Sequence, residues 1–557
     1  MVPLALVPAA FIVGLLGISL YLSFRTSVLD PTITLANYVV IFNEPAALDA
    51  AINTALFSVI TVAVAMTVGV GIAWLVERTD VRGKSLIGGL MTVGLLVPGL
   101  FTAMGWIFIA HPRIGALNAW ARDALGAPDA IFNVASVPGM AFVQGLTLAA
   151  LVYVLVGASL RAMDTSLEEA AQMSGARGID IARRVTLPLA WPSLLAACLY
   201  VLTIAVSAFD IPLVIGSANR ITLFSTYLYS KAFPVSGLPE YGLSAAFGTF
   251  MIGLGIVLGI VYSRMLRQAR RYQVVSGKAY RARPLHLGRW VYAAWLAIGM
   301  YLLLAQILPL LLVLFESFQP FTVPPSFEAF GRASLANYSI IGGQLGDPDS
   351  TTRRSILHTV ILMICAPLLA LALGLVISWV VVRTRSRLRY LLDFVAFLPH
   401  AVPPVIFALA ASAAALFLFA PLGLYGSLAL LIFTLGLAQI SFATRVTNSA
   451  IIQISSDLEE AAYVSGASIL ITVRRIVLPL LRSAFVFGFL WLSILAFREL
   501  TMASMLFSKD NITLSQQTWA LIRGGTTTQA AALSIVQMAF LLPLVVLYLR
   551  VTKGRPV

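Results

Sequence analysis

The sequence predicts an all-α membrane protein of about twelve transmembrane helices, arranged as two parallel repeats of six helices. Hydrophobic residues make up 60% of the 557 residues and charged residues only 11%, so the mean hydropathy of +0.94 is far above that of a soluble domain. The apolar residues come in runs of about 20, the length that a helix needs to cross the hydrocarbon layer. Several sequence patterns also occur twice, about half a chain length apart.

The first half of the chain contains six apolar runs bounded by charged residues, Pro or Gly. The first run lacks a charged amino-terminal region and a small-residue cleavage pattern, so we interpret it as a span and not as a signal peptide. Continuous apolar runs indicate helices, because the strands of a membrane barrel are short and alternate in polarity. The six expected spans lie near residues 2–24, 52–77, 86–110, 136–160, 190–215 and 241–263.

The second half repeats this arrangement after a basic stretch. A turn around Pro421 and Gly423 separates its third and fourth runs. We therefore expect one six-span half at residues 1–263, a cytoplasmic linker at 264–289 and a second six-span half at 290–557. The expected spans of the second half lie near residues 290–315, 356–382, 391–418, 422–447, 481–507 and 529–549.

The charges indicate how the chain is oriented. It carries 37 Lys and Arg residues against 23 Asp and Glu, a formal net charge of +14. If both termini are cytoplasmic, most of the basic residues fall in cytoplasmic segments, as the positive-inside rule requires. Membrane orientation and contact with the lipid surface therefore explain the basic surplus, and no nucleic-acid partner is needed.

An internal repeat decides the architecture. Leu35-Ala36-Asn37-Tyr38 recurs as Leu335-Ala336-Asn337-Tyr338, before the second span of each half. Each half has an even number of spans, so both halves have the same orientation in the membrane. A second set of matches falls in the second spans, where Thr54, Gly69, Trp74, Arg78 and Thr79 recur as Thr359, Gly374, Trp379, Arg383 and Thr384.

The strongest repeated pattern lies between the fourth and fifth spans of each half. Leu167-Glu168-Glu169-Ala170-Ala171 recurs as Leu458-Glu459-Glu460-Ala461-Ala462, and Gly175 or Gly466 follows. Acidic residues suit the first turn of a short helix, where they face the positive end of the helix dipole, and the glycine lets the chain turn. Small alanines let a partner surface approach closely, and a glutamate offers an anion to a basic partner.

The boundaries of this cytoplasmic segment follow from local chemistry. Asp164, Thr165 or Ser166 is expected to cap the amino-terminal end of the first short helix. A second short helix carries arginines and is expected to close at Leu187-Pro188, or at Leu478-Pro479 in the second copy, just before the fifth span.

This spacing of Glu-Ala-Ala, Gly and Leu-Pro, present twice, resembles the coupling-loop signature of permease subunits of ATP-binding cassette importers. The resemblance covers nearly the whole chain, because fused permeases with two six-span halves are known in the branch that handles ferric iron. The linker segment 277–290 is similar to the linker of that branch. The resemblance assigns ATPase coupling to Glu168, Glu169, Ala170, Ala171, Gly175, Leu187, Pro188, Glu459, Glu460, Ala461, Ala462, Gly466, Leu478 and Pro479.

The same resemblance implies a fold, partners and a location. We expect the type I importer permease fold in the inner membrane of a bacterium, with both termini cytoplasmic. Two copies of a separate ATP-binding subunit would dock on the two loops, and a periplasmic or lipid-anchored binding protein would deliver the solute. Ferric iron is the favoured substrate, with thiamine, polyamines and phosphonates as alternatives from the same family.

Catalytic and metal signatures are absent from the sequence. Gly83-Lys84-Ser85 is the nearest approach to a phosphate-binding loop, but Arg78 stands where the first glycine is required. Cys198 and Cys365 lie inside apolar runs and lack the spacing of metal ligands. We therefore expect a translocation subunit with no catalytic residues, no metal site and no bound cofactor, which depends on a partner chain for ATP hydrolysis.

Two competing classes were weighed. A secondary transporter of the major facilitator type also has twelve spans, and Asp80-Val81-Arg82-Gly83-Lys84 is superficially similar to its loop signature, but Val81 interrupts the required Asp-Arg pair. A membrane-embedded enzyme would need His or acidic residues clustered within the spans, and only scattered ones are present. Two fully matched coupling loops favour the importer.

Ionisable residues at membrane depth are candidates for the translocation pathway, because each is costly in hydrocarbon. Asp210 and the pair Arg498 and Glu499 fall at comparable places along the fifth spans, so we expect them to face each other across a central pathway. A structural ion pair is the alternative. His400 lies among prolines in a broken-helix pattern that can line a cavity, whereas His358 matches Asn53 and is expected to be an interfacial polar residue.

Overall fold

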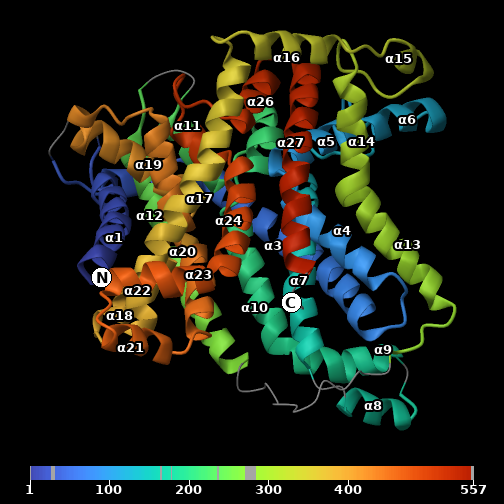
Figure 1. Cartoon of the computed structure of the whole chain (residues 1–557). Helices are drawn as coiled ribbons and strands as arrows, with labels where there is room; N and C mark the ends of the chain where they lie inside the picture. The colour runs from blue at the N-terminus through green and yellow to red at the C-terminus, as the bar shows by residue number, and fades with distance from the viewer. Residues whose placement is uncertain are drawn as a thin grey trace.

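The chain is a bundle of helices (Figure 1). In the described residues, nine helices are long and apolar enough to cross a membrane, and three sharply bent pairs raise the number to twelve if each pair is one span. The prediction of an all-α membrane protein with about twelve spans is therefore confirmed. The structure, a computed structural model, describes residues 2–26, 32–163, 166–176, 178–234, 238–269 and 284–553.

The long helices follow the predicted order in both halves. Those of the first half are α1 (Val2–Ser23), α3 (Pro45–Arg78), α7 (Val137–Ala162), α10 (Leu187–Val206) and α12 (Tyr241–Ala269). Those of the second half are α13 (Trp290–Leu302) continued by α14 (Leu308–Ser317), α17 (Thr351–Arg383), α20 (Leu428–Ile452) and α27 (Thr527–Lys553). The expected division at residues 264–289 stays a prediction, and residues 270–283 of the linker lie outside the described residues.

The third span of each half is broken. In the first half, α4 (Lys84–Leu96) and α5 (Gly99–Ala110) meet at 97°, and in the second half α18 (Leu388–Ala401) and α19 (Pro404–Ala413) begin a pair bent by 103°. The residue before each proline, Val97 or Val402, has an extended backbone, because proline disfavours a helical conformation in the residue that precedes it. Sequence analysis predicts one run at 86–110; the structure corrects this to two helices.

The fifth spans end earlier than predicted. α10 ends at Val206, and its counterpart α24 (Arg482–Phe497) ends at the equivalent point of the second half. Asp210 and the pair Arg498 and Glu499 therefore follow the helix ends, where free carbonyl groups and a turn of the chain are available to them.

The repeated Leu-Ala-Asn-Tyr pattern anchors two short helices, α2 (Ala36–Asn43) and α16 (Ala336–Gly346), to the first span of each half. The amide of Asn37 donates to the carbonyl oxygens of Ser23 and Arg25, at 2.9 and 2.7 Å. Asn337 donates in the same way to two carbonyls at the end of α14. The repeat thus supplies donors to the carbonyls that a helix leaves free at its carboxyl end.

Close helix pairs form the centre of each half. α3 packs along α7, and α17 packs along α20. A Cβ atom at Gly69 would lie 2.6 Å from the Cβ of Val152, and one at the matched Gly374 would lie 2.9 Å from the Cβ of Ala443. The two glycines are therefore required for close helix approach, as is usual where membrane helices pack on small residues.

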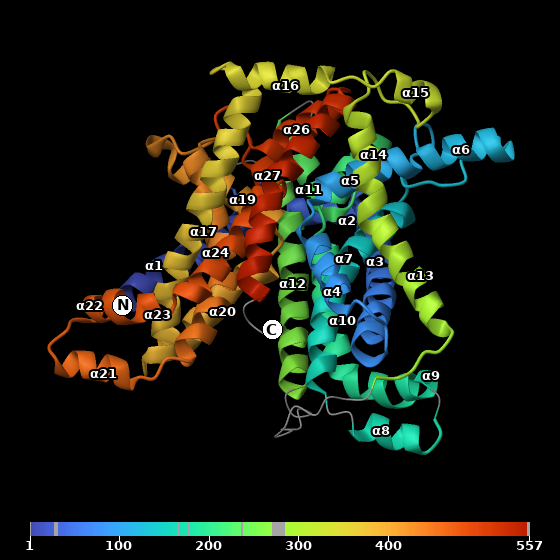
Figure 2. The ribbon, with the colours of Figure 1, turned by 45° about the vertical axis from the view of Figure 1, so that its right-hand side comes forward.

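The first spans are exchanged between the halves. α1 packs against α17, α18 and α19 of the second half, and α14 packs against α5 of the first half. Figure 2 shows α13 and α14 beside α4 and α7, far from α17. The exchange ties the two halves into one body.

The remaining short helices lie in connections between the spans. They are α6 (Ala116–Leu125), α11 (Phe224–Ala232), α15 (Phe327–Gly331), α25 (Thr501–Met505) and α26 (Leu514–Arg523). Four more, α8, α9, α21 and α22, belong to the site.

Candidate functional site

Two loops carry the repeated Glu-Ala-Ala pattern; we name residues 166–188 motif loop 1 and residues 456–479 motif loop 2. Motif loop 1 contains α8 (Ser166–Met173), α9 (Gly178–Ile181) and a π-helical turn that runs directly into α10. Motif loop 2 contains α21 (Asp457–Val464), α22 (Ile469–Thr472) and a π-helical turn followed by α23 (Leu478–Leu480). Figure 1 shows α8 and α21 at the same end of the molecule, opposite α16. Asp164 and Thr165, two of the three expected caps, lie outside the described residues.

A glycine ends the first helix of each motif loop. Gly175 has φ +84° and Gly466 has φ +81°, in the left-handed region that favours glycine. The N–H of the next residue, Ala176 or Ala467, donates back to a carbonyl of the helix at 3.0 or 2.9 Å. Both glycines therefore have the turning geometry that the sequence predicts for them.

A buried ion pair holds each motif loop to the end of the second span. Arg78 Nε lies 3.2 Å from Glu168 Oε1, with only 6% and 8% of the two side chains exposed, and Arg383 Nε lies 2.8 Å from Glu459 Oε1. The hydroxyl of Thr186 also donates to Glu168 Oε1 at 2.7 Å. Glu168 and Glu459 are thus used inside the chain, where they position the motif loops.

The following acidic residues have different surroundings. Glu460 is exposed, whereas Glu169 is half-buried. Among the small residues, Ala170 and Ala461 are exposed, Ala171 is half-buried and Ala462 is buried. The Leu-Pro pairs, Leu187 with Pro188 and Leu478 with Pro479, are exposed at the base of the loops.

Sequence analysis missed two apolar residues that dominate the free surface of these helices. Met173 and Val464 are both 91% exposed, and they stand at equivalent positions of the two copies. Leu167 and Leu458, near the beginning of the same helices, are also exposed. The available signal was an apolar residue at the end of a short, otherwise polar helix, which occurs in both copies. The first helix of each motif loop therefore has an exposed apolar residue at its end.

The ends of the fifth spans meet at the interface between the halves. Thr501 Oγ1 donates to Asp210 Oδ1 at 3.3 Å, and these two residues occupy equivalent positions in the repeat. Asp210 also lies against the break of the third span, because a Cβ atom at Gly99 would be 2.9 Å from its carboxylate. The residues that meet at the centre are therefore one carboxylate and one hydroxyl.

Arg498 and Glu499 act on backbone groups beside this contact. Arg498 donates to the carbonyl oxygens of Leu95 and Val97 at 2.7 and 3.3 Å, across the interface to the other half. Glu499 accepts from the N–H of Met502 at 2.8 Å and so caps α25. Asp210 accepts a hydrogen bond from Thr501 and also interacts electrostatically with Arg498 and Glu499, and the expectation that these residues face each other across a pathway stays a prediction.

His400 lies apart from these hydrogen bonds. Its ring stacks on Tyr200 of α10, with ring centroids 5.2 Å apart and planes inclined by 20°, and its other aromatic neighbour is Phe397. It contacts the opposite half by stacking. In the described residues, no group of three His, Cys, Asp or Glu side chains is placed to hold a metal ion.

The fold and the two motif loops define a multi-pass membrane protein of two equivalent halves, each with one copy of the repeated loop. Comparison with known proteins then gives the family. Residues 65–272 and 370–553 both match the family described as binding-protein-dependent transport system inner membrane component. The chain belongs to this family, and it is the permease component of an ATP-binding cassette importer.

Individual relatives agree on the family but differ in substrate. A probable ABC transporter permease of Sinorhizobium fredii is 27% identical over 534 residues, which cover 90% of this chain and 87% of the relative. A ferric transport system permease of Actinobacillus pleuropneumoniae is 26% identical over 62% of this chain and 48% of its own length. A probable molybdenum ABC transporter permease of Haloferax volcanii is 27% identical over 38% of this chain and 73% of the relative.

Among the solved structures that the chain matches is one from a bacterial importer. A bacterial ABC transporter chain involved in the import of alginate is 18% identical, has a TM-score of 0.36, and is matched over 47% of this chain and 96% of its own length. The family match decides against the major facilitator alternative. Membership of the family implies an ATPase and a substrate-binding protein as partners.

Proposed function

We propose that this chain supplies both halves of the translocation pathway of a ferric-iron importer, with both motif loops docked on two copies of one ATPase. The observation that carries the coupling role is the pair of equivalent helices, α8 and α21, each held to its half by a buried Arg–Glu pair. A buried pair transmits force because its geometry is fixed by its surroundings. Movement of either loop would therefore move α3 or α17 with it.

The exposed surface of the motif loops supports docking on an ATPase. Met173 and Val464 would each enter an apolar recess of the partner, and Glu169 and Glu460 would meet basic side chains at its rim. ATP binding would bring the two ATPase copies together and thereby move α8 and α21. Transport would follow by rigid-body movement of one half against the other.

The pathway would run between the halves, past Asp210, Thr501 and the pair Arg498 and Glu499. These residues lie where the fifth spans meet, and both acidic residues are half-buried. Two carboxyl groups beside one arginine are an acidic surplus, which suits a cationic solute. Ferric relatives support iron as that solute, and the molybdenum relative makes molybdate the alternative.

The orientation of the protein is also a proposal. With both termini cytoplasmic, the motif loops and most basic residues lie on the cytoplasmic side, and α16 faces the periplasm. A periplasmic or lipid-anchored binding protein would then deliver the solute to the α16 side.

A double charge reversal tests the coupling role. Glu169→Arg with Glu460→Arg should leave the protein inserted in the membrane but abolish its co-purification with the ATPase and its uptake of solute. The matched control is Glu328→Arg on α15, an exposed acid at the opposite end of the molecule, which should leave both properties unchanged. Wild-type uptake by the double variant would overturn the docking role, and uptake of labelled molybdate in place of iron would overturn the substrate.

A further inference from the structure

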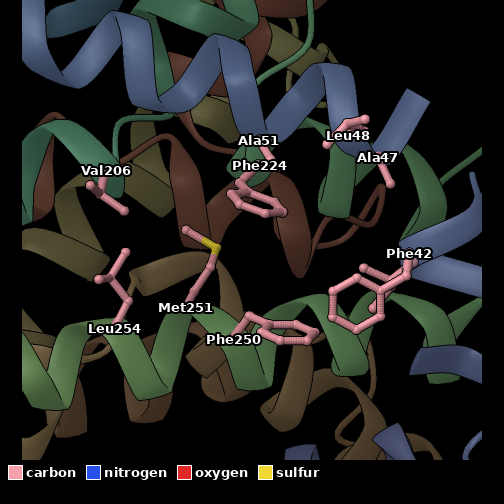
Figure 3. Close-up of a pocket in the computed structure, with 10 residues that line it drawn as sticks. Phe42, Ala47, Leu48, Ala51, Val206, Phe224, Phe250, Met251 and Leu254 are labelled. Atoms are coloured by element: carbon pink, nitrogen blue, oxygen red, sulfur yellow. The ribbon is translucent and has the colours of Figure 1, made fainter. Parts of the chain in front are cut away.

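An apolar groove lies on the first half, away from the motif loops. It has a volume of about 320 Å³ and lies between α2, α3, α10 and α12. Figure 3 shows Phe42 toward one end of the groove and Val206 and Leu254 toward the other, with Met251 and Phe250 between them. This arrangement suits an extended apolar group such as an acyl chain.

The groove opens toward the surroundings of the bundle. Phe42 is 75% exposed, and Leu48, Phe250 and Leu254 are also exposed on its walls. In a membrane-spanning chain, exposed apolar side chains on the outside of the spans face lipid. An apolar cavity that faced lipid but stayed empty would lose dispersion contacts on every wall, and water has no polar partners there.

The depth of the groove places it at the boundary of the hydrocarbon layer. Val206 is the last of the 20 residues of α10, a helix length of about 30 Å, which is about the thickness of the hydrocarbon layer. The other end of α10 follows the exposed Arg183 and Arg184 of motif loop 1. The groove thus lies in the leaflet opposite the motif loops, just below the head groups.

Charged groups at the end of the groove distinguish between head groups. Glu44 follows α2 directly and pairs with Lys231 at 3.0 Å, and Lys231 is shared with Glu240 at 3.5 Å. Asp49 is exposed in the second turn of α3. Three carboxylates against one ammonium group leave a negative surface, which attracts a head group that carries an amine and repels one with only a phosphate charge.

The residues that line the groove are not repeated in the second half. The positions of Phe42, Ala47, Leu48 and Ala51 correspond in the repeat to Gly342, Thr352, Arg353 and Ile356. These replacements remove an aromatic wall, introduce polar groups and fill the position of a small residue. The groove is therefore a property of the first half and not of the shared fold.

We propose that this groove is a phospholipid-binding site, which takes one acyl chain of the surrounding leaflet and places an amine-bearing head group beside Glu44 and Asp49. The ligand class is an aminophospholipid such as phosphatidylethanolamine. The site does not depend on the substrate of the importer or on the role of the motif loops.

Photolabelling in a defined membrane tests the site. The full chain with its ATPase would be placed in lipid discs that contain phosphatidylethanolamine with a diazirine near the middle of one acyl chain, and labelled peptides would be mapped by mass spectrometry. The peptide that contains Met251 and Leu254 should be labelled well above the other lipid-exposed peptides. Labelling at the same level as the rest of the lipid-exposed surface would overturn the site.

A pair of variants gives the matched control. Ala51→Phe fills the groove and should reduce labelling about tenfold, because excluding two methylene groups is enough for that loss. Ile356→Phe changes the equivalent position of the second half and should leave labelling unchanged. If Ala51→Phe fails to insert, Leu254→Phe narrows the groove from its exposed wall and should lower labelling too. Unchanged labelling in an inserted groove variant would overturn the proposal.

The head group is tested with a second lipid. Phosphatidylglycerol with the same diazirine chain should label the groove less than phosphatidylethanolamine does, and Glu44→Gln with Asp49→Asn should reduce that difference. Equal labelling by the two lipids in the unchanged protein would overturn the assignment of an amine-bearing head group.

Discussion

Each motif loop has an equivalent Arg–Glu ion pair, but the other contacts of the arginine differ between the two halves. In the second half, Arg383 binds Glu459 and also donates to the carbonyls of Ile451 and Ile454 at 3.1 and 2.7 Å. In the first half, Arg78 has Glu168 as its side-chain partner, and its own carbonyl accepts from the N–H of Leu285 at the end of the linker. The repeat therefore specifies the ion pair, while the neighbours that brace it are particular to each half.

The path from loop to span differs as well. In the first half the π-helical turn leads straight into α10, so the last part of motif loop 1 and the fifth span form one continuous helix, Ala182–Val206. In the second half the same segment is bent by 74° at Leu481 before α24 begins. A displacement of motif loop 1 would therefore be transmitted along the axis of its fifth span, whereas a displacement of motif loop 2 would be transmitted at an angle to α24. If the loops dock on two ATPase copies as proposed, the two copies would move their spans in different directions.

The largest test of this comparison removes each arginine in turn. Arg383→Ala leaves Glu459 buried without a partner and frees two carbonyls, a local loss of about 3–5 kcal/mol. Arg78→Ala should cost less, because Glu168 keeps the hydrogen bond from Thr186. Hydrogen exchange in peptides of α21 and α8 measures the two losses separately. Equal exchange in the two variants would contradict the difference in bracing.

The glycine turns provide a test with equal expected effects in both halves. Gly175→Val and Gly466→Val force a β-branched residue into the left-handed region, which costs about 1–2 kcal/mol or more. Both should weaken co-purification with the ATPase to a similar degree. Gly71→Val is the control, since this glycine is inside α3 with open space beside it and no positive φ. A strong effect from only one glycine would mean that the loops dock differently.

The contact between Asp210 and Thr501 joins a carboxylate of the first half to a hydroxyl of the second half, and each residue can be tested separately. In a background with Cys198→Ser and Cys365→Ser, cysteine placed at position 210 or at position 501 should react with a small charged thiol reagent, and the rate should change when ATP and the ATPase are added. Asp210→Asn should also slow uptake of a cation about tenfold, as the focused negative potential is lost. Thr501→Val should slow it less, because it removes no charge.

Inertness of both cysteines in every state would contradict a pathway at this contact. Normal uptake by Asp210→Asn together with Glu499→Gln would show that these carboxylates serve structure alone. The matched buried control is cysteine at position 530, which replaces a fully enclosed alanine of α27 and should stay unreactive.

The smallest expected effect is a pH dependence of the contact between Asp80 and the end of the linker, which exists only in the first half. Asp80 accepts a hydrogen bond from His286 and another from the N–H of Leu287, and these bonds lower the pKa of the Asp80 carboxyl below its usual value. Its ionised form therefore stabilises the junction above the unfolded pKa, and this stability is lost as the pH falls through the lowered folded pKa. Exchange at residues 284–289 should rise in strong acid, and Asp80→Asn should show the fast exchange at every pH.

The second half offers the natural comparison. Arg385 stands at the position equivalent to Asp80 and cannot accept such bonds. Peptides around Arg385 should therefore show no acid transition of this kind, and one of equal size there would contradict the assignment to Asp80.

Composition and repeats were enough to predict the fold class, the number of spans and the turning glycines. The prolines around His400 predicted the broken helix at Val402, whereas the break at Val97 was missed. The run around Val97 stays apolar across Pro98, so hydropathy alone hides the bend, and that single proline was the available signal.

The internal partners of the site residues could be predicted only in part. Arg78 and Glu168 each recur in the second half, so both were marked as repeated, but nothing in the sequence pairs residues that are so far apart. Thr501 gave no signal, because a hydroxyl in an apolar segment has many ordinary roles. The expectation for Glu499 rested on charge, whereas the hydrogen bond from Thr501 to Asp210 could have been found from the repeat register, in which these two positions are equivalent.

The exchange of first spans has a consequence for synthesis of the protein. α1 is synthesised well before its partners α18 and α19, which emerge only after about another 360 residues, a delay of roughly 20–70 s at about 5–20 residues per second. During that time its face toward the second half rests against lipid. A chain that ends after the linker would leave the face of α1 that packs against α17, α18 and α19 exposed to lipid. Membrane quality control should therefore recognise such truncated chains by this uncovered face.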